Sequence, residues 1–396
     1  MEAPSETSDA IASLDEKAPF ADTDPETEPA PAEDREGALV DGQEAPWETP
    51  QEAGEDGDPF VVDEPVKGQR VGRFLQLGSR LDVGASLRSA AGRAKEVFAR
   101  VSVAAPKETT TLTIEHGYVK LLVTQGREVV DYRIVPANPR FFREGLVSDA
   151  PRIAGLLEEA IQDLSGGHKR VIAAVPGYQT NLRRIDVPNV KGMDPKVVIP
   201  NEARRTMGIS PNDTRITWHH LTGTVETSSW LVVSATKRSI TSISAPAASA
   251  GLATTAVELR PFAVARATNE ADAVFAWAAA DGCDAVVVRD WVPMTYQAAY
   301  WGAGLTMESS DLVNRIVEVV ESTVDAHDIQ NPEMVASRDI PIFVYGSPAA
   351  EDVGISPRVA ELLGRETLEP DIPLDLPDGF PLDELIVNVG LSLWDE

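Results

Sequence analysis

The side chains in this sequence that could do chemistry are five histidines, one cysteine and scattered serines, and their spacing decides what they can do. His116, His168 and His327 have no partner at the short spacing that metal ligands use. His219 and His220 are neighbours in an expected strand, so their side chains point to opposite faces and cannot chelate one metal together. We therefore expect no metal site.

Nucleophilic catalysis is not indicated either. Ser347 lacks the G-x-S-x-G context of a nucleophile elbow. Cys283 lies in the turn-like segment 281–284 and is expected to be a buried thiol. A single cysteine also excludes an intramolecular disulfide and fits a reducing cytoplasm. Because no second member of a catalytic set is present, we expect no catalytic residue.

Glu115, His116 and Gly117 form the most informative turn of the chain. They separate two runs of β-branched and apolar residues, 111–115 and 118–124, and a third run follows at 128–135. This pattern predicts three antiparallel strands joined by tight turns. Glycine in such a turn lets backbone N–H groups approach an anion, but here the turn also carries a carboxylate.

Charge divides the chain into zones. Residues 1–66 hold 21 acidic and two basic side chains, a net charge of −19, and predict a disordered acidic tail. Residues 67–107 hold nine basic and two acidic side chains, a net charge of +7, which leaves −16 of the total −28 for residues 108–396. The acidic body argues against nonspecific nucleic-acid binding. The N-terminal residues show no positively charged leader of a secretory signal, and the longest apolar run, 273–280, is too short to span a bilayer. We therefore expect a cytoplasmic protein, peripheral at the inner face of the membrane.

The basic zone 67–107 predicts an amphipathic helix. Arginines flank one apolar arc, an arrangement that suits an anionic membrane surface. Packing of this helix on its own domain or on a protein partner is the alternative. The residues that define it are Leu87, Arg88, Arg93, Val97, Phe98, Arg100 and Val101.

From Thr109 onward the patterns predict an ordered α/β body in three parts. Residues 109–178 hold the three strands, a helix and a further strand, and 179–250 form an inserted small α/β unit. Residues 251–396 return to the first body and complete it. The strands expected after the first three are 170–175, 182–187, 214–221, 229–235, 254–259, 285–289, 294–300 and 340–345.

Local motifs follow one another in the order of a known family. They are VKLL at 119–122, EGLVSDAPRIAGLLEEAI at 144–161, KRVIAAVPGYQTNLRRIDVPNV at 169–190 and AVELRPFAVARA at 256–267. Together these segments resemble the type IV pilus assembly protein PilM family, relatives of the division protein FtsA in the actin-like superfamily. The resemblance covers 109–396 and implies an α/β, actin-like ATPase fold with an inserted small α/β subdomain.

The resemblance also implies a nucleotide cleft built from two phosphate hairpins and a glycine-rich adenosine loop. In the first hairpin, Thr113 stands where the family has aspartate and Glu115 where it has glycine. A shifted alignment would make Glu115 the acid and Gly117 the glycine, with Lys120 following in both alignments. In the first alignment Glu115 would place a negative charge against a polyphosphate, which is unfavourable in a partly desolvated site.

In the second hairpin the same comparison gives Arg289 in place of the acid and Trp291 in place of the glycine. Thr295 matches the family, and Gly302 lies at the next turn. An indole at a phosphate-binding turn would close it. Arg289 as a replacement phosphate contact is the alternative.

The adenosine loop retains Gly346, but Pro348 removes a backbone donor from it. The segment between the second hairpin and this loop is short. The subdomain that closes over the nucleotide base is therefore expected to be reduced to the helix 312–324. What remains of the cleft is Gly117, Lys120, Thr295, Gly302 and Gly346. We expect no cofactor, with ATP and Mg possible only where this cleft is retained.

The resemblance thus implies a non-catalytic cytoplasmic scaffold of type IV pilus assembly or of a related secretion machine. It would dock the N-terminal peptide of a PilN-like bitopic membrane protein in the inserted unit, residues 179–250. Two alternatives stay open. One is an actin-like ATP-binding protein or slow ATPase with an altered site, and the other is an FtsA-like, membrane-tethered protein that forms polymers.

Overall fold

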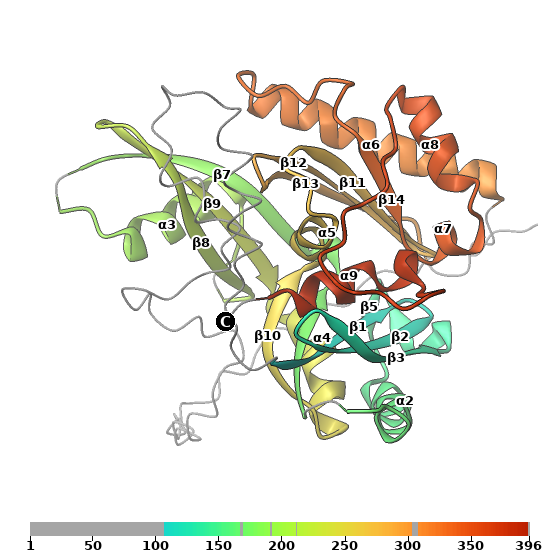
Figure 1. The fold of residues 1–396 in the computed structure, drawn as a ribbon. Helices are drawn as coiled ribbons and strands as arrows, with labels where there is room; N and C mark the ends of the chain where they lie inside the picture. The colour runs from blue at the N-terminus through green and yellow to red at the C-terminus, as the bar shows by residue number, and fades with distance from the viewer. Residues whose placement is uncertain (1–106, 167–168, 191, 211, 303–307, 395–396) are drawn as a thin grey trace, which may run out of the picture. The chain divides into compact units, whose positions relative to one another are not determined.

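The computed structural model describes residues 107–394 except 167–168, 191, 211 and 303–307 (Figure 1). The expected acidic tail, and the expected basic helix up to residue 106, therefore lie outside the described residues. No helix in the described part of the chain has the length and apolar character needed to cross a membrane.

The first sheet confirms the three antiparallel strands expected from the sequence. Its order is β10-β6-β1-β2-β3, with β1 parallel to β6 and β6 parallel to β10. Gly117 and Gly126 close the two hairpins with φ of +92° and +65°, a backbone region that glycine adopts without strain. The strands are β1 (Glu108–Glu115), β2 (Tyr118–Gln125), β3 (Glu128–Pro136), β6 (Arg170–Val175) and β10 (Ala253–Leu259).

Helices α2 (Ala150–Gln162) and α4 (Lys237–Ser249) pack on one face of this sheet. Asp149 caps α2 by accepting a hydrogen bond from the Arg152 N–H, and Thr236 caps α4 in the same way. Because α4 packs against α2, it belongs to the first body and not to the inserted unit. Short elements connect β3 to α2 and β6 to β7: η2 (Pro139–Phe141), β4 (Phe142–Arg143), β5 (Leu146–Val147) and η3 (Gly177–Gln179).

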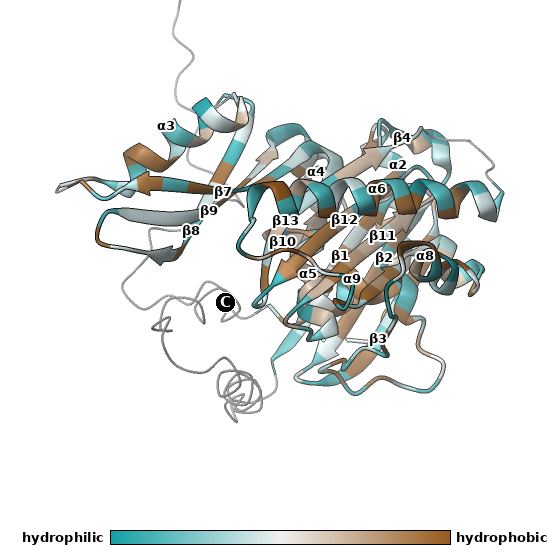
Figure 2. Ribbon diagram, turned by 90° about the horizontal axis from the view of Figure 1, so that it is seen from above, coloured by the Kyte–Doolittle hydropathy of each residue, from teal (hydrophilic) through white to brown (hydrophobic). Residues whose placement is uncertain are grey.

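The second sheet has the order β13-β12-β11-β14. Helices α6 and α8 cover one of its faces, and α5 and α9 lie between its other face and the first sheet. Figure 2 shows the consequence, with apolar strands beneath a partly polar α6. The elements are α5 (Arg260–Thr268), β11 (Ala273–Ala279), β12 (Gly282–Arg289), β13 (Val292–Tyr300), α6 (Ser309–Gln330), β14 (Ile342–Tyr345), α7 (Ser347–Glu351), α8 (Ile355–Leu363) and α9 (Leu382–Ser392).

The inserted small unit is a three-stranded antiparallel sheet with one helix on it. Its order is β7-β9-β8, from β7 (Thr180–Pro188), β8 (Thr214–Gly223) and β9 (Thr227–Thr236). Helix α3 (Pro195–Met207) covers part of one face, begins at the Asp194 cap and ends at Gly208, whose φ is +64°. In Figure 1 this unit extends away from the two larger sheets.

Strand β11 was not expected. Its sequence, AVFAWAA, lacks the polar alternation of a half-exposed strand because both of its faces are buried. Between β13 and β14 the described residues contain one helix, α6, which packs on β12 and β13. The closing subdomain is therefore reduced, as expected.

Candidate functional site

Three chain segments that follow strands meet between the two large sheets. They are the β1–β2 turn, the β11–β12 turn and the loop from β14 to α7. His116 Nδ1 in the first lies 3.6 Å from Asp281 Oδ2 in the second, and Lys120 on β2 lies 3.3 Å from Ser347 Oγ in the third. We call this cluster, with Glu115, the three-turn junction.

Lys120 is the centre of the junction and is fully buried. Its ammonium donates to Glu115 Oε2 at 2.7 Å, to the Glu384 carbonyl at 2.9 Å and to Ser347 Oγ at 3.3 Å. Three acceptors for three N–H donors satisfy the ammonium completely. The ammonium of Lys120 is thus already neutralised and hydrogen-bonded by the protein itself.

Glu115 and His116 keep unused polar atoms in this interior. Glu115 Oε1 and His116 Nδ1 are buried and make no hydrogen bond within the described residues. The 3.6 Å distance from His116 Nδ1 to Asp281 Oδ2 is too long for a hydrogen bond. The His116 ring lies 5.4 Å from the ring of Phe142. Burial raises the pKa of Asp281, and the nearby charges of His116 and Arg260 oppose that rise.

A second ion pair stands beside the junction. Arg260, the first residue of α5, places its Nε 3.3 Å from Asp284 Oδ2 and its guanidinium 4.1 Å from the centre of the Trp277 ring. Burial raises the pKa of Asp284, and Arg260 opposes that rise. Both side chains are about nine-tenths buried, so this pair is held in the interior like that of Lys120.

In this arrangement Lys120 is already hydrogen-bonded within the protein and is not available to a nucleotide phosphate. A triphosphate at the β1–β2 turn would have to displace Glu115 from Lys120, because that carboxylate already pairs with the ammonium. Like charges at short range in a desolvated site repel strongly. The chemistry of the junction is that of internal ion pairing.

The residues expected in the first hairpin lie close together, but not all face the junction. Thr113 points to α9, where its Oγ1 donates to Asn388 Oδ1 at 2.9 Å. Gly117 supplies the left-handed backbone of the turn, and a Cβ there would meet no atom within 4 Å. Of the first-hairpin residues that the family comparison singled out, Glu115 and Lys120 are therefore the ones whose side chains build the junction, together with the neighbouring His116.

The expected adenosine loop follows β14. Gly346 has a φ of +114°, and a Cβ on it would lie 1.9 Å from the Ala278 carbonyl oxygen. Glycine is thus required for close packing of two backbones. Pro348 lies in the first turn of α7, where its missing N–H leaves no intrahelical bond unmade.

The assignment of the second phosphate hairpin to 287–295 is corrected by the structure. Because β11 was missed, the family comparison placed the second phosphate hairpin at β12–β13, one strand too late. In the structure the hairpin whose turn meets the β1–β2 turn is β11–β12. Arg289 and Trp291 lie at the other end of β12 from Asp281, roughly 26 Å along the strand. Arg289 pairs with Asp272 at 2.9 Å and donates to the Val335 carbonyl at 2.9 Å.

The other residues of that assignment also have different roles. Asp290 and Trp291 are the central residues of the β12–β13 turn, with φ of +52° and +69°. Thr295 lies within β13, where its Oγ1 is 3.1 Å from His327 Nδ1 on α6. Gly302 follows β13 and lies near the junction, since the preceding Trp301 N–H donates to the Asp281 carbonyl at 2.9 Å.

Several residues in or beside the junction were missed from the sequence, namely Asp281 within it and Arg260, Trp277 and Asp284 beside it, and His116 was set aside for lack of a metal partner. The signal that could have found them is the apolar run 273–280 followed by Asp281-Gly282 and a second apolar run, which is a strand–turn–strand pattern.

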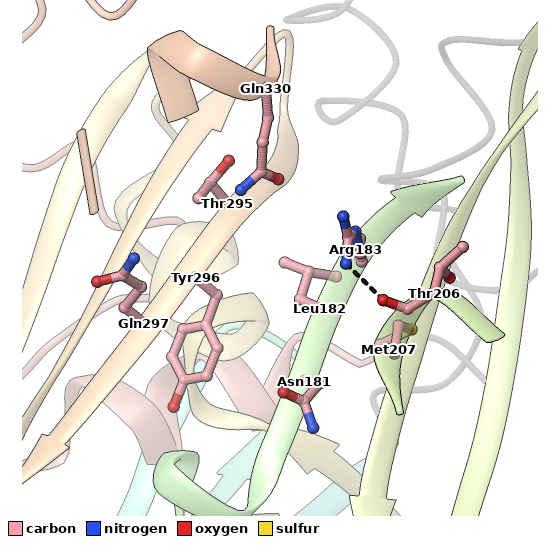
Figure 3. A pocket seen from close by; sticks show the side chains of 9 residues that line it. All are labelled: Asn181, Leu182, Arg183, Thr206, Met207, Thr295, Tyr296, Gln297 and Gln330. Atoms are coloured by element: carbon pink, nitrogen blue, oxygen red, sulfur yellow. Dashed lines mark hydrogen bonds between the residues drawn. The ribbon is translucent and has the colours of Figure 1, made fainter. Parts of the chain in front are cut away.

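A separate cavity of about 270 Å³ lies between the small unit and the second sheet (Figure 3). On one side Arg183 of β7 donates to the Thr206 carbonyl at the end of α3 at 2.7 Å. Nearby, Arg184 is 3.1 Å from Glu333, which ties β7 to the segment after α6. The residues that line the cavity are Asn181, Leu182, Arg183, Thr206, Met207, Thr295, Tyr296, Gln297 and Gln330.

No protein-family model matches this sequence, and no curated protein sequence matches it. Several solved structures match the structure of this chain. A chain of a PilM–PilN type IV pilus biogenesis complex matches with a TM-score of 0.57 at 18% identity, over 73% of this chain and 98% of that one. The ethanolamine utilization protein EutJ of Carboxydothermus hydrogenoformans matches with a TM-score of 0.43 at 16% identity, over 74% and 92%. The cytoplasmic domain of EpsL, an inner-membrane component of the type II secretion system of Vibrio cholerae, matches with a TM-score of 0.40 at 13% identity, over 72% and 95%. The chain has the actin-like ATPase fold.

Proposed function

We propose that this protein is a PilM-like scaffold of a type IV pilus or related secretion machine, that it works without nucleotide, and that its role is to bind a membrane partner. The observation that carries the proposal is the buried pair of Lys120 and Glu115, whose ammonium and carboxylate lie 2.7 Å apart. In an actin-like fold a phosphate would be held at this turn. Here the carboxylate of Glu115 pairs with the ammonium of Lys120 instead.

The choice of machine is supported by the likeness to the PilM chain of a PilM–PilN complex, together with the motifs at 119–122, 144–161, 169–190 and 256–267. The partner we propose is accordingly a PilN-like bitopic membrane protein, which would present a short N-terminal peptide to the small unit. The basic segment 67–107 would add contact with an anionic membrane at the inner face, because two weak attachments on one chain reinforce each other.

Co-purification tests this proposal. The tagged full-length chain is expressed in the organism from which it comes. The membranes are solubilised, and the proteins that co-purify with the chain are identified by mass spectrometry. We expect a stoichiometric single-span membrane protein with a short cytoplasmic N-terminus. A synthetic peptide of that N-terminus should then bind the purified full-length chain saturably in a calorimetric titration. Absence of such a partner, or a peptide that does not bind, would overturn the proposal.

A further inference from the structure

The small unit meets the second sheet across a polar cavity and not through a close-packed interface. The cavity of about 270 Å³ lies between β7 and β13, and three carboxamides line it, those of Asn181, Gln297 and Gln330 (Figure 3). At its base the unit is anchored to the first body, since Leu231 and Ala235 belong to the apolar core that includes α2 and α4. Two parts of a chain that meet through polar groups can shift relative to each other at modest cost. The attachment of the small unit to the second sheet therefore depends on individual side chains.

One of these side chains is Arg184 of β7. Its Nη1 lies 3.1 Å from Glu333 Oε1, in the segment that follows α6. The guanidinium is also held within the small unit, because Nη2 donates to Ser229 Oγ on β9 at 3.2 Å and Nε lies 3.5 Å from Asp186 Oδ1. The side chains of Arg184 and Glu333 are 28% and 56% exposed. An ion pair this exposed is weak, so it depends on neighbours that hold its geometry and breaks at little cost when they move.

The position of Glu333 is set by a buried histidine. His327, near the end of α6, is fully buried, and its Nε2 donates to the carbonyl of Met334, the residue after Glu333, at 2.8 Å. Since a carbonyl can only accept, Nδ1 of the neutral ring is left as an acceptor. It receives hydrogen bonds from Thr295 Oγ1 at 3.1 Å and from Asn331 Nδ2 at 3.3 Å. The neutral ring therefore fastens the segment that carries Glu333 to α6 and β13.

A protonated ring cannot make the same contacts. Both ring nitrogens of an imidazolium are donors, so Nδ1–H of His327 would face the Nδ2–H of Asn331. The amide of Asn331 is held in that orientation by a second hydrogen bond, from Nδ2 to the His327 carbonyl at 3.1 Å. The hydroxyl of Thr295 can turn to accept, but the contact between the ring and the Asn331 amide is lost. Protonation thus removes one of the hydrogen bonds that hold the segment 331–334 in place.

The groups around His327 act on its protonation in both directions. Burial is the largest effect and lowers the pKa of His327 below its ordinary value of 6.5. The hydrogen bond to the Met334 carbonyl and the carboxylates of Asp328 and Glu333 raise that pKa, whereas the guanidinium of Arg289 at the end of β12 lowers it further. Strand β13 faces the ring with an uncharged hydroxyl. The ring is therefore neutral near pH 7 and takes up a proton only in acid.

We propose that Arg184 and Glu333 form a latch that holds the small unit against the second sheet, and that protonation of His327 releases this latch. At neutral pH the ring positions the segment after α6, and the latch is closed. In acid this segment loosens, Glu333 leaves Arg184, and the small unit turns about its anchor on the first body. The device does not depend on which partner the small unit binds, and it moves the unit whether or not a partner is present.

Distance measurements between two spin labels test this inference. Nitroxides are attached at Val225→Cys in the β8–β9 turn and at Glu321→Cys on α6, both exposed positions, while Cys283 is buried and stays unlabelled. Double electron–electron resonance is recorded on the labelled full-length protein over the pH series in which it stays folded. We expect a narrow distance distribution near neutral pH that broadens and lengthens by several ångströms in acid. A distribution that does not change with pH would overturn the inference.

Variants in the labelled protein separate the latch from its trigger. His327→Gln keeps a donor for the Met334 carbonyl but cannot take up a proton, so its distribution should stay narrow at every pH. Glu333→Gln should give the broad distribution at every pH. Glu144→Gln is the control, since it breaks the exposed Arg238–Glu144 pair within the first body and should behave like the wild type. An acid response that survives in His327→Gln, or a narrow distribution of Glu333→Gln at neutral pH, would contradict the proposed latch.

Discussion

The ammonium of Lys120 lies 2.7 Å from a carboxylate oxygen of Glu115, and both side chains are buried at the first turn of the actin-like fold. We propose that this carboxylate takes the place of a bound phosphate at the β1–β2 turn. Because Lys120 also donates to Ser347 and to the Glu384 carbonyl, it joins three segments that are distant in sequence. The pair therefore has a structural role that can be measured.

Breaking this pair should destabilise the protein strongly. Glu115→Gln leaves the buried ammonium without a countercharge, and we expect a loss of about 3–5 kcal/mol in the free energy of unfolding, measured with urea. The double variant Glu115→Gln with Lys120→Met should recover most of that loss. The exposed Arg238–Glu144 pair, 3.3 Å apart, is the control, and Arg238→Met should cost less than about 1 kcal/mol. A small effect of Glu115→Gln would contradict the assignment.

Gly346 should be required for packing and not for an anion. A Cβ at this position would lie 1.9 Å from the Ala278 carbonyl oxygen, at a φ of +114°. We expect Gly346→Ala to lower the free energy of unfolding by about 2–4 kcal/mol. Gly251→Ala is the matched control, with a φ of +78° and no atom within 4 Å, and should cost only about 1 kcal/mol. Equal losses in the two variants would show that the close approach to Ala278 is unimportant.

His327 should make stability depend on pH. Its Nε2 donates to the Met334 carbonyl at 2.8 Å, so Nδ1 is the acceptor for Thr295 Oγ1 at 3.1 Å. Burial lowers the pKa of His327 below its ordinary value of 6.5, so the unfolded chain binds more protons in the window just below that value. Stability should therefore rise with pH through this window and be lost as pH falls toward the lowered pKa.

Urea unfolding at a series of pH values checks this dependence. The comparison is between the wild type and His327→Gln, whose amide can still donate to the Met334 carbonyl. The difference between the two proteins isolates His327 from the buried carboxyl groups that also titrate in acid. Parallel stability profiles for the two proteins would rule His327 out as the titrating group.

The basic segment should bring the chain to anionic membranes. Replacing two apolar residues of the expected helix, Val97→Asp with Phe98→Asp, should reduce co-sedimentation of the full-length protein with anionic vesicles severalfold. Glu96→Gln, on the polar side of the same segment, is the control and should bind at least as well as the wild type. Equal sedimentation of all three proteins would remove the membrane role.

Local patterns predicted most of the fold. The β1–β3 ladder, the helix expected within 109–178 and the inserted α/β unit followed from strand alternation and helical periodicity, which are encoded within a few residues. Strand β11 was missed because a strand buried on both faces shows no alternation. That omission moved the second hairpin to Arg289 and Trp291, at the far end of β12.

The candidate site was predicted only in part, because it is made by long-range contacts. Glu115 was recognised as unusual and Lys120 as a retained cleft residue, and their ion pair joins residues only five apart, but the contacts of Lys120 with Ser347 and with the Glu384 carbonyl span more than 220 residues. Arg260 and Asp284 look unremarkable in sequence, and they become a buried pair only when α5 packs on the second sheet. No local pattern carries that information.

The most direct test of the account is thermal unfolding of the full-length protein with and without saturating Mg-ATP. A ligand that binds the folded state raises the unfolding temperature in proportion to its binding free energy. Because Glu115 already neutralises Lys120, we predict an unchanged unfolding temperature with Mg-ATP, Mg-ADP or Mg alone. A rise of several degrees with Mg-ATP alone would contradict the claim that this actin-like fold works without nucleotide.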